Sequence, residues 1–207
     1  MKHFEHGGFT LIELMIALAI FAFLIAIAGP QYASFLGNMQ IRNGGENTLA
    51  GLRLAQVEAV RGNLQGKFVL DPTLGTGGWT VWTYNGGDGI AGNPSCTATG
   101  TPQWCLVQSY SWADGAAKTT VTATPPGATE VVFNGLGQIV SNNSALVDSD
   151  ATATITQIDI TNSNVSNPRP LRVAIKPATS SGVTIKLCDP DPGVASNDPH
   201  DPRICPS

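Results

Sequence analysis

The stretch GGFTLIELMI, residues 7–16, decides what this chain can be, together with the apolar run that follows it to residue 28. Residues 9–28 number 20, and Glu13 carries the only charge among them. At about 1.5 Å of rise per residue, such a helix is roughly 30 Å long, which is the thickness of the hydrocarbon core of a bilayer. The run therefore predicts a membrane-spanning helix.

Glu13 is the feature that a plain anchor does not explain, because a carboxylate in a membrane helix costs about 2.5–3.5 kcal/mol and normally has a partner or a task. One interpretation places Glu13 near the membrane surface, solvated by water. In the other, cleavage of the Gly8–Phe9 bond frees an α-amine, whose usual pKa of about 7.7–8.0 keeps it largely protonated near neutral pH. That amine can pair with Glu13 of a neighbouring copy, which favours staggered assembly of identical or related helices.

The residues from Gly8 to Glu13 resemble the prepilin-peptidase site of type IV pilins and type II secretion pseudopilins. The resemblance implies that residues 1–8 are a leader peptide and that Phe9 is the mature, N-methylated first residue. It also implies that Glu13 is the glutamate on which assembly depends. A secretory signal peptide is cut after its apolar region, whereas here the cut precedes that region and the helix is kept.

The helix is expected to continue beyond the membrane. Gly29-Pro30 predicts a kink or local melting, because proline removes a backbone hydrogen bond and clashes with the preceding turn. Gly62-Asn63 is a stop signal, so the helix covers residues 9–62, with a transmembrane segment at about 9–30. Its second half is amphipathic and must pack on the rest of the chain. The expected apolar stripe consists of Tyr32, Phe35, Leu36, Met39, Leu49, Leu52, Leu54, Ala55, Val57, Ala59 and Val60.

After residue 66 the hydrophobic period changes to two, which is typical of strands separated by turns. Strands are expected at residues 67–70, 79–84, 104–112, 119–123, 130–133, 138–140, 153–161, 171–176 and 183–188. A chain of 207 residues has room for one compact domain after the helix, at residues 63–207. We therefore expect an α+β fold in which the long N-terminal helix packs on an antiparallel sheet of consecutive hairpins.

The four cysteines occur as two close pairs, Cys96 with Cys105 and Cys188 with Cys205. Sequence alone allows three connectivities. The short loops, rich in proline, glycine and asparagine, favour the disulfides Cys96–Cys105 and Cys188–Cys205, which an oxidising compartment would preserve. A zinc site is the alternative, but no CxxC spacing occurs and only His200 of the three histidines lies near a cysteine pair.

Composition and motifs argue against catalysis, a cofactor or general nucleic-acid binding. The formal net charge is −4 and only 13% of the residues are charged, which disfavours affinity for phosphate. The sequence contains neither a Gly-x-Ser-x-Gly elbow nor an HExxH motif, so no catalytic residue, cofactor or metal site is predicted. The aspartates between residues 189 and 201 have the oxygen ligands that calcium prefers, but a rigid surface loop closed by Cys188 and Cys205 is the preferred interpretation.

Three further segments resemble the GspH/FimT group, which unites type II secretion protein H with minor pilins of the FimT and FimU kind. They are the helix ending at residues 52–61, the hairpin at 131–138 and the run at 171–190. The resemblance implies a pilin fold and a minor type IV pilin near the filament tip, with a type II secretion pseudopilin of the pseudopilus tip as the alternative.

The same resemblance implies partners and a location. The partners would be other major and minor pilins or pseudopilins, a prepilin peptidase, an inner-membrane assembly platform and, before assembly, the lipid bilayer. The protein would cross the bacterial inner membrane once, with its C-terminal domain in the periplasm, and would then enter a pilus or pseudopilus.

A minor pilin that binds DNA during DNA uptake is a further alternative. Some FimT-like pilins carry a basic GRxR hairpin late in the chain, but the equivalent stretch here, residues 182–186, lacks both arginines. A local basic patch would have to come from Arg169, Arg172, Lys176, Lys186 and Arg203. Its phosphate contacts would weaken strongly with salt.

Overall fold

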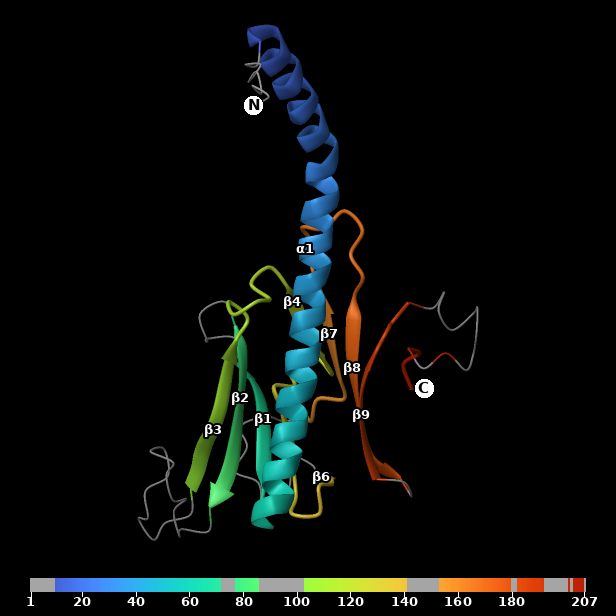
Figure 1. Cartoon of the computed structure of the whole chain (residues 1–207). Coiled ribbons are helices and arrows are strands. Elements are labelled where there is room, and N and C mark those ends of the chain that lie inside the picture. The colour runs from blue at the N-terminus through green and yellow to red at the C-terminus, as the bar shows by residue number, and fades with distance from the viewer. Residues whose placement is uncertain are drawn as a thin grey trace, which may run out of the picture.

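The structure, a computed structural model, describes residues 10–71, 77–85, 103–140, 153–179, 182–191, 201 and 203–206. Within these ranges the chain forms a helix whose N-terminal half stands clear of the sheets (Figure 1). The elements are α1 (Leu11–Gly62), β1 (Gly66–Asp71), β2 (Gly78–Asn85), β3 (Gln103–Ser111), β4 (Thr120–Thr124), β5 (Glu130–Phe133), β6 (Ile139–Val140), β7 (Gln157–Thr161), β8 (Leu171–Thr179) and β9 (Gly182–Cys188). The expected α+β fold, a long N-terminal helix on antiparallel strands, is confirmed.

Helix α1 is one unbroken element of 52 residues, about 78 Å long at 1.5 Å per residue. It continues through Gly29 and Pro30, so the local melting that we allowed for is absent, and a kink at this pair stays a prediction. The helix ends at the expected stop signal. There Asn63 has the left-handed conformation, with φ 49°, and donates its backbone N–H to the carbonyls of Ala59 and Val60. Asparagine tolerates this conformation and therefore closes helices well.

The strands form two antiparallel sheets, and the expectation of a single sheet of consecutive hairpins is wrong. One sheet has the order β3-β2-β1-β5-β6 and the other the order β4-β7-β8-β9. Strand β4 leaves its chain neighbours to pair with β7, and β5 returns to pair with β1. Both sheets pack against α1, with β1 to β3 on one side of it in Figure 1 and β7 to β9 on the other. Helix α1 thus contributes to the hydrophobic core beneath both sheets.

The strand expected at residues 153–161 begins only at Gln157. The preceding residues cross between the sheets: Thr154 bridges Glu130 in parallel, and the backbone N–H of Thr156 donates to the carbonyl of Thr124 at 2.8 Å. Alternation in the sequence could not distinguish this crossing from a strand, because both conformations are extended and both place alternate side chains inward.

Three glycines allow the sheets to approach the helix. Gly37, Gly44 and Gly51 recur at intervals of seven residues, so they lie on one face, and all three are buried. A Cβ on Gly51 would lie 2.9 Å from Cε2 of Trp79 and 3.0 Å from Cε2 of Phe68. Each glycine costs about 1 kcal/mol of helix propensity relative to alanine. Close packing with the sheets explains why these positions nevertheless lack a side chain.

The buried stripe of α1 is therefore narrower than expected. Leu52, Ala55 and Ala59 are buried as predicted, but Tyr32, Phe35, Leu36, Met39, Val57 and Val60 are exposed. The first four lie at or near the upper limit of the sheets. Val57 and Val60 lie towards the edge of the contact, and Val60 Cγ2 is beside the β5–β6 turn, 3.1 Å from where a Cβ on Gly137 would be. The contact is completed by small or unexpected residues, namely Gly37, Ile41, Gly44, Gly45, Thr48 and Gly51.

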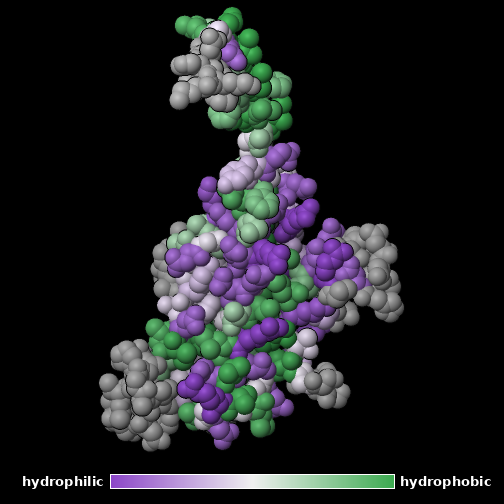
Figure 2. All heavy atoms as spheres, in the orientation of Figure 1, coloured by the Kyte–Doolittle hydropathy of each residue, from purple (hydrophilic) through white to green (hydrophobic). Residues whose placement is uncertain are grey.

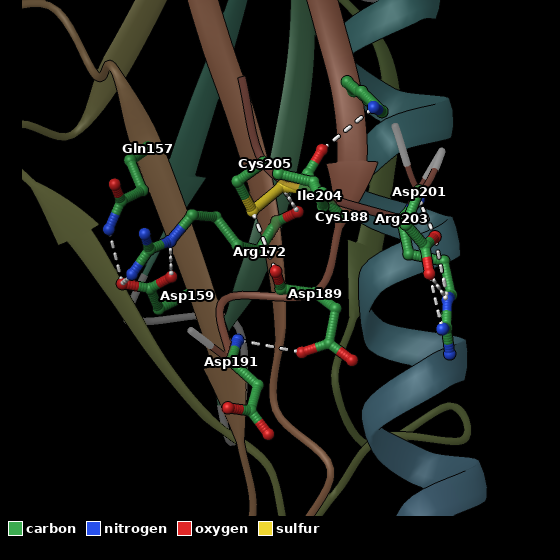
Figure 3. The surroundings of a disulfide bond; sticks show 11 residues. Gln157, Asp159, Arg172, Cys188, Asp189, Asp191, Asp201, Arg203, Ile204 and Cys205 are labelled. Carbon is green, nitrogen blue, oxygen red and sulfur yellow. Dashed lines mark hydrogen bonds and ion pairs between the residues drawn. A yellow bond between two sulfur atoms is a disulfide. The ribbon is translucent and has the colours of Figure 1, made fainter. Parts of the chain in front are cut away.

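A disulfide joins Cys188, at the end of β9, to Cys205, 17 residues further along the chain, as the sequence predicted (Figure 3). It returns the C-terminal segment to β9, where the backbone N–H of Asp189 donates to the carbonyl of Arg203 at 2.8 Å. Lys186 Nζ donates to the carbonyl of Ile204 at 2.9 Å. Cys105 is buried and disulfide-bonded, but its predicted partner, Cys96, lies outside the described residues.

Gly51→Val is expected to lower the free energy of unfolding by about 1–3 kcal/mol, because the added methyl groups would overpack the contact with Phe68 and Trp79. Urea unfolding of the detergent-solubilised full chain, followed by tryptophan fluorescence, would measure this. Gly62→Val is the matched control, since a Cβ there meets only Leu64, at 3.6 Å or more. Equal stability of the two variants would contradict the close-packing role of Gly51.

Replacing both Cys188 and Cys205 by alanine is expected to lower the free energy of unfolding by about 3 kcal/mol, because a loop of this length is no longer closed in the unfolded chain. The same urea experiment measures the loss, and reduction of the wild-type chain gives the loss of all disulfides together. A double variant as stable as the oxidised wild type would show that the hydrogen bonds to residues 203–204 hold the segment alone.

Candidate functional site

The helix begins in a capping arrangement at the junction that the sequence singles out. Thr10 is the N-cap, with extended backbone angles of φ −80° and ψ 152°. Its Oγ1 accepts a hydrogen bond from the backbone N–H of Glu13 at 3.3 Å, and its carbonyl accepts one from Leu14 at 3.1 Å. Gly8 and Phe9, between which cleavage is predicted, lie outside the described residues.

Glu13 lies in the first turn of α1 and its side chain is exposed. Over the part of the chain that the structure describes, no side chain pairs with its carboxylate. The spacing Thr10-x-x-Glu13 is that of a capping box, a local signal that our sequence analysis missed. A carboxylate near the positive end of the helix dipole also contributes about 0.3–1 kcal/mol. Thr10 thus caps the helix through the backbone of Glu13, and the carboxylate of Glu13 remains available to a partner.

The N-terminal half of α1 is bare on every side. Nearly all of residues 11–36 are exposed, including aliphatic and aromatic side chains, and the segment is long and apolar enough to cross a membrane. Figure 2 shows this hydrophobic surface at the far end of the molecule, separated from the mixed surface of the domain by a paler neck. Within α1, burial of described residues begins at Gly37.

Two loops hold the C-terminal half of α1 in place. The connection between β7 and β8 packs Val165 against Gly37, and the backbone N–H of Arg169 donates to Asn38 Oδ1 at 2.9 Å. At the other end of the helix, Gln56 Nε2 donates to the carbonyl of Gly137 at 2.9 Å. Gly137 has φ 71° in the turn between β5 and β6, where glycine is favoured. The hairpin at 131–138 therefore braces the C-terminal end of the helix.

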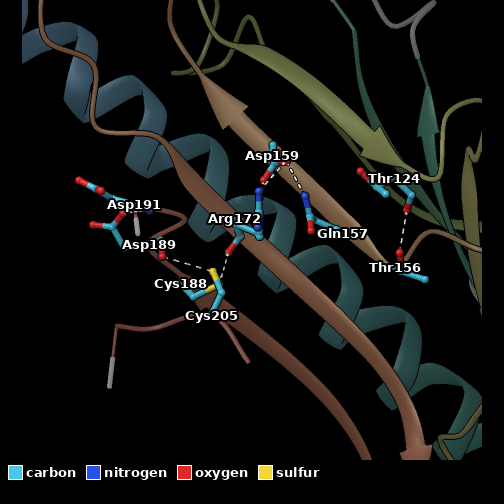
Figure 4. A network of polar contacts seen from close by, with 9 residues as sticks. All are labelled: Thr124, Thr156, Gln157, Asp159, Arg172, Cys188, Asp189, Asp191 and Cys205. Carbon is cyan, nitrogen blue, oxygen red and sulfur yellow. Dashed lines mark hydrogen bonds and ion pairs between the residues drawn. A yellow bond between two sulfur atoms is a disulfide. The ribbon is translucent and has the colours of Figure 1, made fainter. Parts of the chain in front are cut away.

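The basic residues proposed as a DNA-binding patch are largely engaged with other groups. Arg172 makes a two-pronged contact with Asp159, at 2.6 and 3.2 Å, and Gln157 donates to the same carboxylate (Figure 4). Arg203 pairs with Asp201 at 2.6 Å, and this hydrogen-bonded contact lowers the pKa of Asp201 to about 2. Both carboxylates offset positive charge that phosphate would require.

The candidate calcium ligands are only partly described. Asp189 and Asp191 lie beside the disulfide, where Asp189 Oδ1 accepts a hydrogen bond from the backbone N–H of Asp191 at 2.9 Å (Figure 3). Among the described residues, no three His, Cys, Asp or Glu side chains cluster closely enough to hold a metal ion. His200 and Asp198 lie outside those residues.

Comparison with known proteins gives a family match in the N-terminal segment and a similar fimbrial protein. Residues 5–29 match the prokaryotic N-terminal methylation motif. The type IV major fimbrial protein FimA of Dichelobacter nodosus is 38% identical to this chain over 103 residues. The match takes in 50% of this chain and 61% of that relative, so the chain spans about three fifths of the relative's length. No solved structure gives a significant match.

The matched motif covers the predicted cleavage site, Glu13 and most of the exposed apolar segment. In the structure, this segment is the free end of a helix whose other half is packed on antiparallel sheets. The chain therefore carries the N-terminal methylation motif typical of type IV prepilins and is similar over half of its length to a type IV fimbrial protein.

Proposed function

We propose that this chain is a minor type IV pilin subunit, cut by a prepilin peptidase after Gly8, N-methylated at Phe9 and inserted into a filament near its tip. The observation that carries the proposal is the division of α1. Residues 37–62 are fixed to the domain, whereas the bare segment before them presents apolar side chains on all sides and a carboxylate without a partner among the described residues.

The bare segment needs an apolar environment at every stage. Leaving a large aliphatic or aromatic side chain in water costs about 1.5–3 kcal/mol relative to burying it, and this segment exposes more than a dozen. The lipid bilayer supplies that environment before assembly, and the helices of neighbouring subunits supply it afterwards. We therefore place the protein in the inner membrane as a single-pass protein with a periplasmic domain, until it enters a filament.

The Glu13 charge can direct the transfer from lipid to filament. Between two apolar environments there is little hydrophobic free energy to gain, so packing and polar contacts decide whether helices associate. An ion pair between Glu13 and the α-amine of Phe9 on a neighbouring subunit would be strong in such a low-dielectric setting. It would also fix how far adjacent subunits are shifted along the filament, because Phe9 of one subunit would have to lie level with Glu13 of the next.

The minor role rests on the resemblance to the GspH/FimT group. All three resembling segments lie where the helix meets the sheets: residues 52–61 form the last turns of α1, the hairpin at 131–138 braces them, and residues 171–190 hold the β8–β9 hairpin and Cys188. The relative in Dichelobacter nodosus is named as a major fimbrial protein, so abundance in the filament is the property to measure. A pseudopilin of the type II secretion pseudopilus is the alternative, and the neighbouring genes would distinguish the two systems.

The proposed role is structural, without catalysis and without a cofactor. Its partners are other pilins or pseudopilins, the peptidase and an inner-membrane assembly platform. DNA uptake is the weaker alternative, and the pairing of Arg172 and Arg203 with carboxylates argues against it. Binding of DNA by the purified chain that weakened with salt and after Lys186→Ala would favour it instead.

The mature protein is expected to begin at Phe9, because the peptidase would remove residues 1–8 and leave the apolar helix in place. Mass spectrometry of the N-terminal peptide from the envelope fraction would identify both the first residue and its methylation. A mature chain that starts at Met1, or anywhere beyond the apolar run, would contradict the proposed function.

Glu13→Gln is expected to reduce incorporation into filaments by about tenfold or more, since the loss of a charge-assisted contact costs about 1.5–3 kcal/mol. Glutamine at this position keeps the Thr-x-x-Gln spacing and the backbone N–H that donates to Thr10, so the variant separates the charge from the helix start. The measurement is the ratio of filament-bound to membrane-bound protein. Glu46→Gln is the control, because Glu46 is an exposed glutamate of the same helix that pairs with Arg42 at 2.7 Å within the chain. Normal incorporation of Glu13→Gln would rule out a directing role for the charge.

A further inference from the structure

The position at which the helix leaves the membrane can be counted along α1. If the hydrocarbon core takes up residues 9–28, then a headgroup layer of about 5–7 Å takes up the next four or five residues. Tyr32 falls in this layer, with 64% of its surface exposed, and Phe35 follows one turn later with 60% exposed. Tyrosine is enriched at this depth in membrane proteins, because its ring is apolar and its hydroxyl is polar.

Among the described residues of the domain, those of the connection between β7 and β8 meet α1 nearest to this layer, at Gly37 and Asn38. Figure 1 shows the connection rising beside α1, above the ends of β7 and β8. Its contacts fix that height: Val165 packs on Gly37, Asn38 Nδ2 donates to the carbonyl of Asn167 at 3.4 Å, and Asn162 Nδ2 donates to Gln40 Oε1 at 3.4 Å. Asn38 lies six residues, or about 9 Å, beyond Tyr32 along the helix. The connection is therefore held just outside the headgroup layer.

Arg169 gives this connection a positive charge. Its backbone is tied to Asn38, but its side chain is exposed and, within the described part of the chain, makes no ion pair or hydrogen bond. An extended arginine side chain reaches from the level of Asn38 to the outer edge of the headgroups. Residues 162–170 contain no carboxylate, so nothing within the connection opposes the charge.

We propose that Tyr32, Phe35 and the connection at residues 162–170 form a membrane-facing collar, in which Arg169 contacts anionic lipid headgroups before the subunit enters a filament. The inference rests on the proposed function in one respect, namely that α1 spans a bilayer. The occupant of this face is the headgroup layer, because the face is continuous with the membrane-spanning segment and carries the complementary charge. The collar would fix the height and rotation of the domain above the membrane while the helix waits for its neighbours.

Lys118 provides a matched control for Arg169. It is also exposed and belongs to the turn after β3, where Asn43 Nδ2 donates to the carbonyl of Gly115 at 3.4 Å. That turn lies about five residues further down α1 than Asn38, roughly 7 Å further from the membrane. The field of an anionic membrane falls off within one Debye length, about 8 Å at physiological salt. Lys118 therefore carries the same charge at a distance where the headgroups attract it much less.

The first arm of the test locates Tyr32. The full chain is labelled with 3-fluorotyrosine and placed in nanodiscs that contain a lipid with a nitroxide on its headgroup. The chain has three tyrosines, so Tyr84 and Tyr110 in the domain serve as internal references. We expect the fluorine signal of Tyr32, assigned with Tyr32→Phe, to be broadened far more than the other two. Absence of this broadening would overturn the collar and would also count against the membrane anchor of the proposed function.

The second arm tests Arg169. Amide hydrogen exchange of residues 163–169 is compared in nanodiscs of phosphatidylglycerol and of phosphatidylcholine. A cation at the surface of an anionic membrane shifts the contact equilibrium about fivefold, so exchange is expected to be slower by that factor in the anionic discs. Arg169→Glu should abolish the difference and Lys118→Glu should retain it. Equal exchange rates in the two lipids, or identical behaviour of the two variants, would overturn the collar. If the fluorine signal of Tyr32 is nevertheless broadened in the first arm, the membrane anchor of the proposed function stands.

Discussion

The close contact between α1 and the two sheets is the constraint on which the rest of the structure depends. One helix must satisfy two environments, and the size of its side chains decides where one gives way to the other. From Gly37 onward, glycine, alanine and threonine on the buried face let the sheets approach its axis. Before Gly37, within the described part of the chain, the helix is exposed almost throughout, and most of its side chains are large and apolar. A single unbroken helix thereby joins a domain stabilised by its own core to a segment that needs an external apolar partner.

Much of this arrangement could be predicted from the sequence. The informative signals are local. They are the apolar run with its lone Glu13, the stop at Gly62-Asn63 and the change to a period of two. In the structure they correspond to the start of α1, its end and the strands that follow. The division into two sheets could not be predicted, because alternation specifies which residues point inward and not which strands pair. The buried glycines were also missed as contacts. From the local sequence, a glycine in a helix counts only as a loss of helix propensity. In the structure, the buried glycines make room for the side chains of Phe68, Trp79, Ile160 and Leu187, which are distant in the chain.

The candidate site shows a different limit. Thr10 caps the helix by accepting the backbone N–H of Glu13, and the Thr-x-x-Glu spacing that signals such a start is readable from the sequence. The unusual position of an acid in an apolar run draws attention away from this signal. The two explanations of Glu13 act at different atoms: the cap uses the backbone N–H of Glu13 as a donor to Thr10, and assembly would use its carboxylate. One residue can therefore serve both without conflict. The cleavage site and Cys96 lie outside the described residues, so for these positions the sequence remains the source of the prediction.

The order of polar groups along the exposed face of α1 bears on how a subunit would leave the membrane. Below the collar, the outward face carries the Arg42–Glu46 pair and then Arg53 and Val57, so it is neither as apolar as lipid nor as polar as a solvated helix. Such a face gains little from lipid and is exposed to water for as long as the subunit is alone. In the proposed filament, neighbouring helices can cover it when the bare segments associate. Association would therefore bury surface that the bilayer cannot reach. The free energy of this burial, added to that of the Glu13 ion pair, favours transfer of the subunit from the membrane to the filament. The apolar segment itself contributes little, because it exchanges one apolar environment for another.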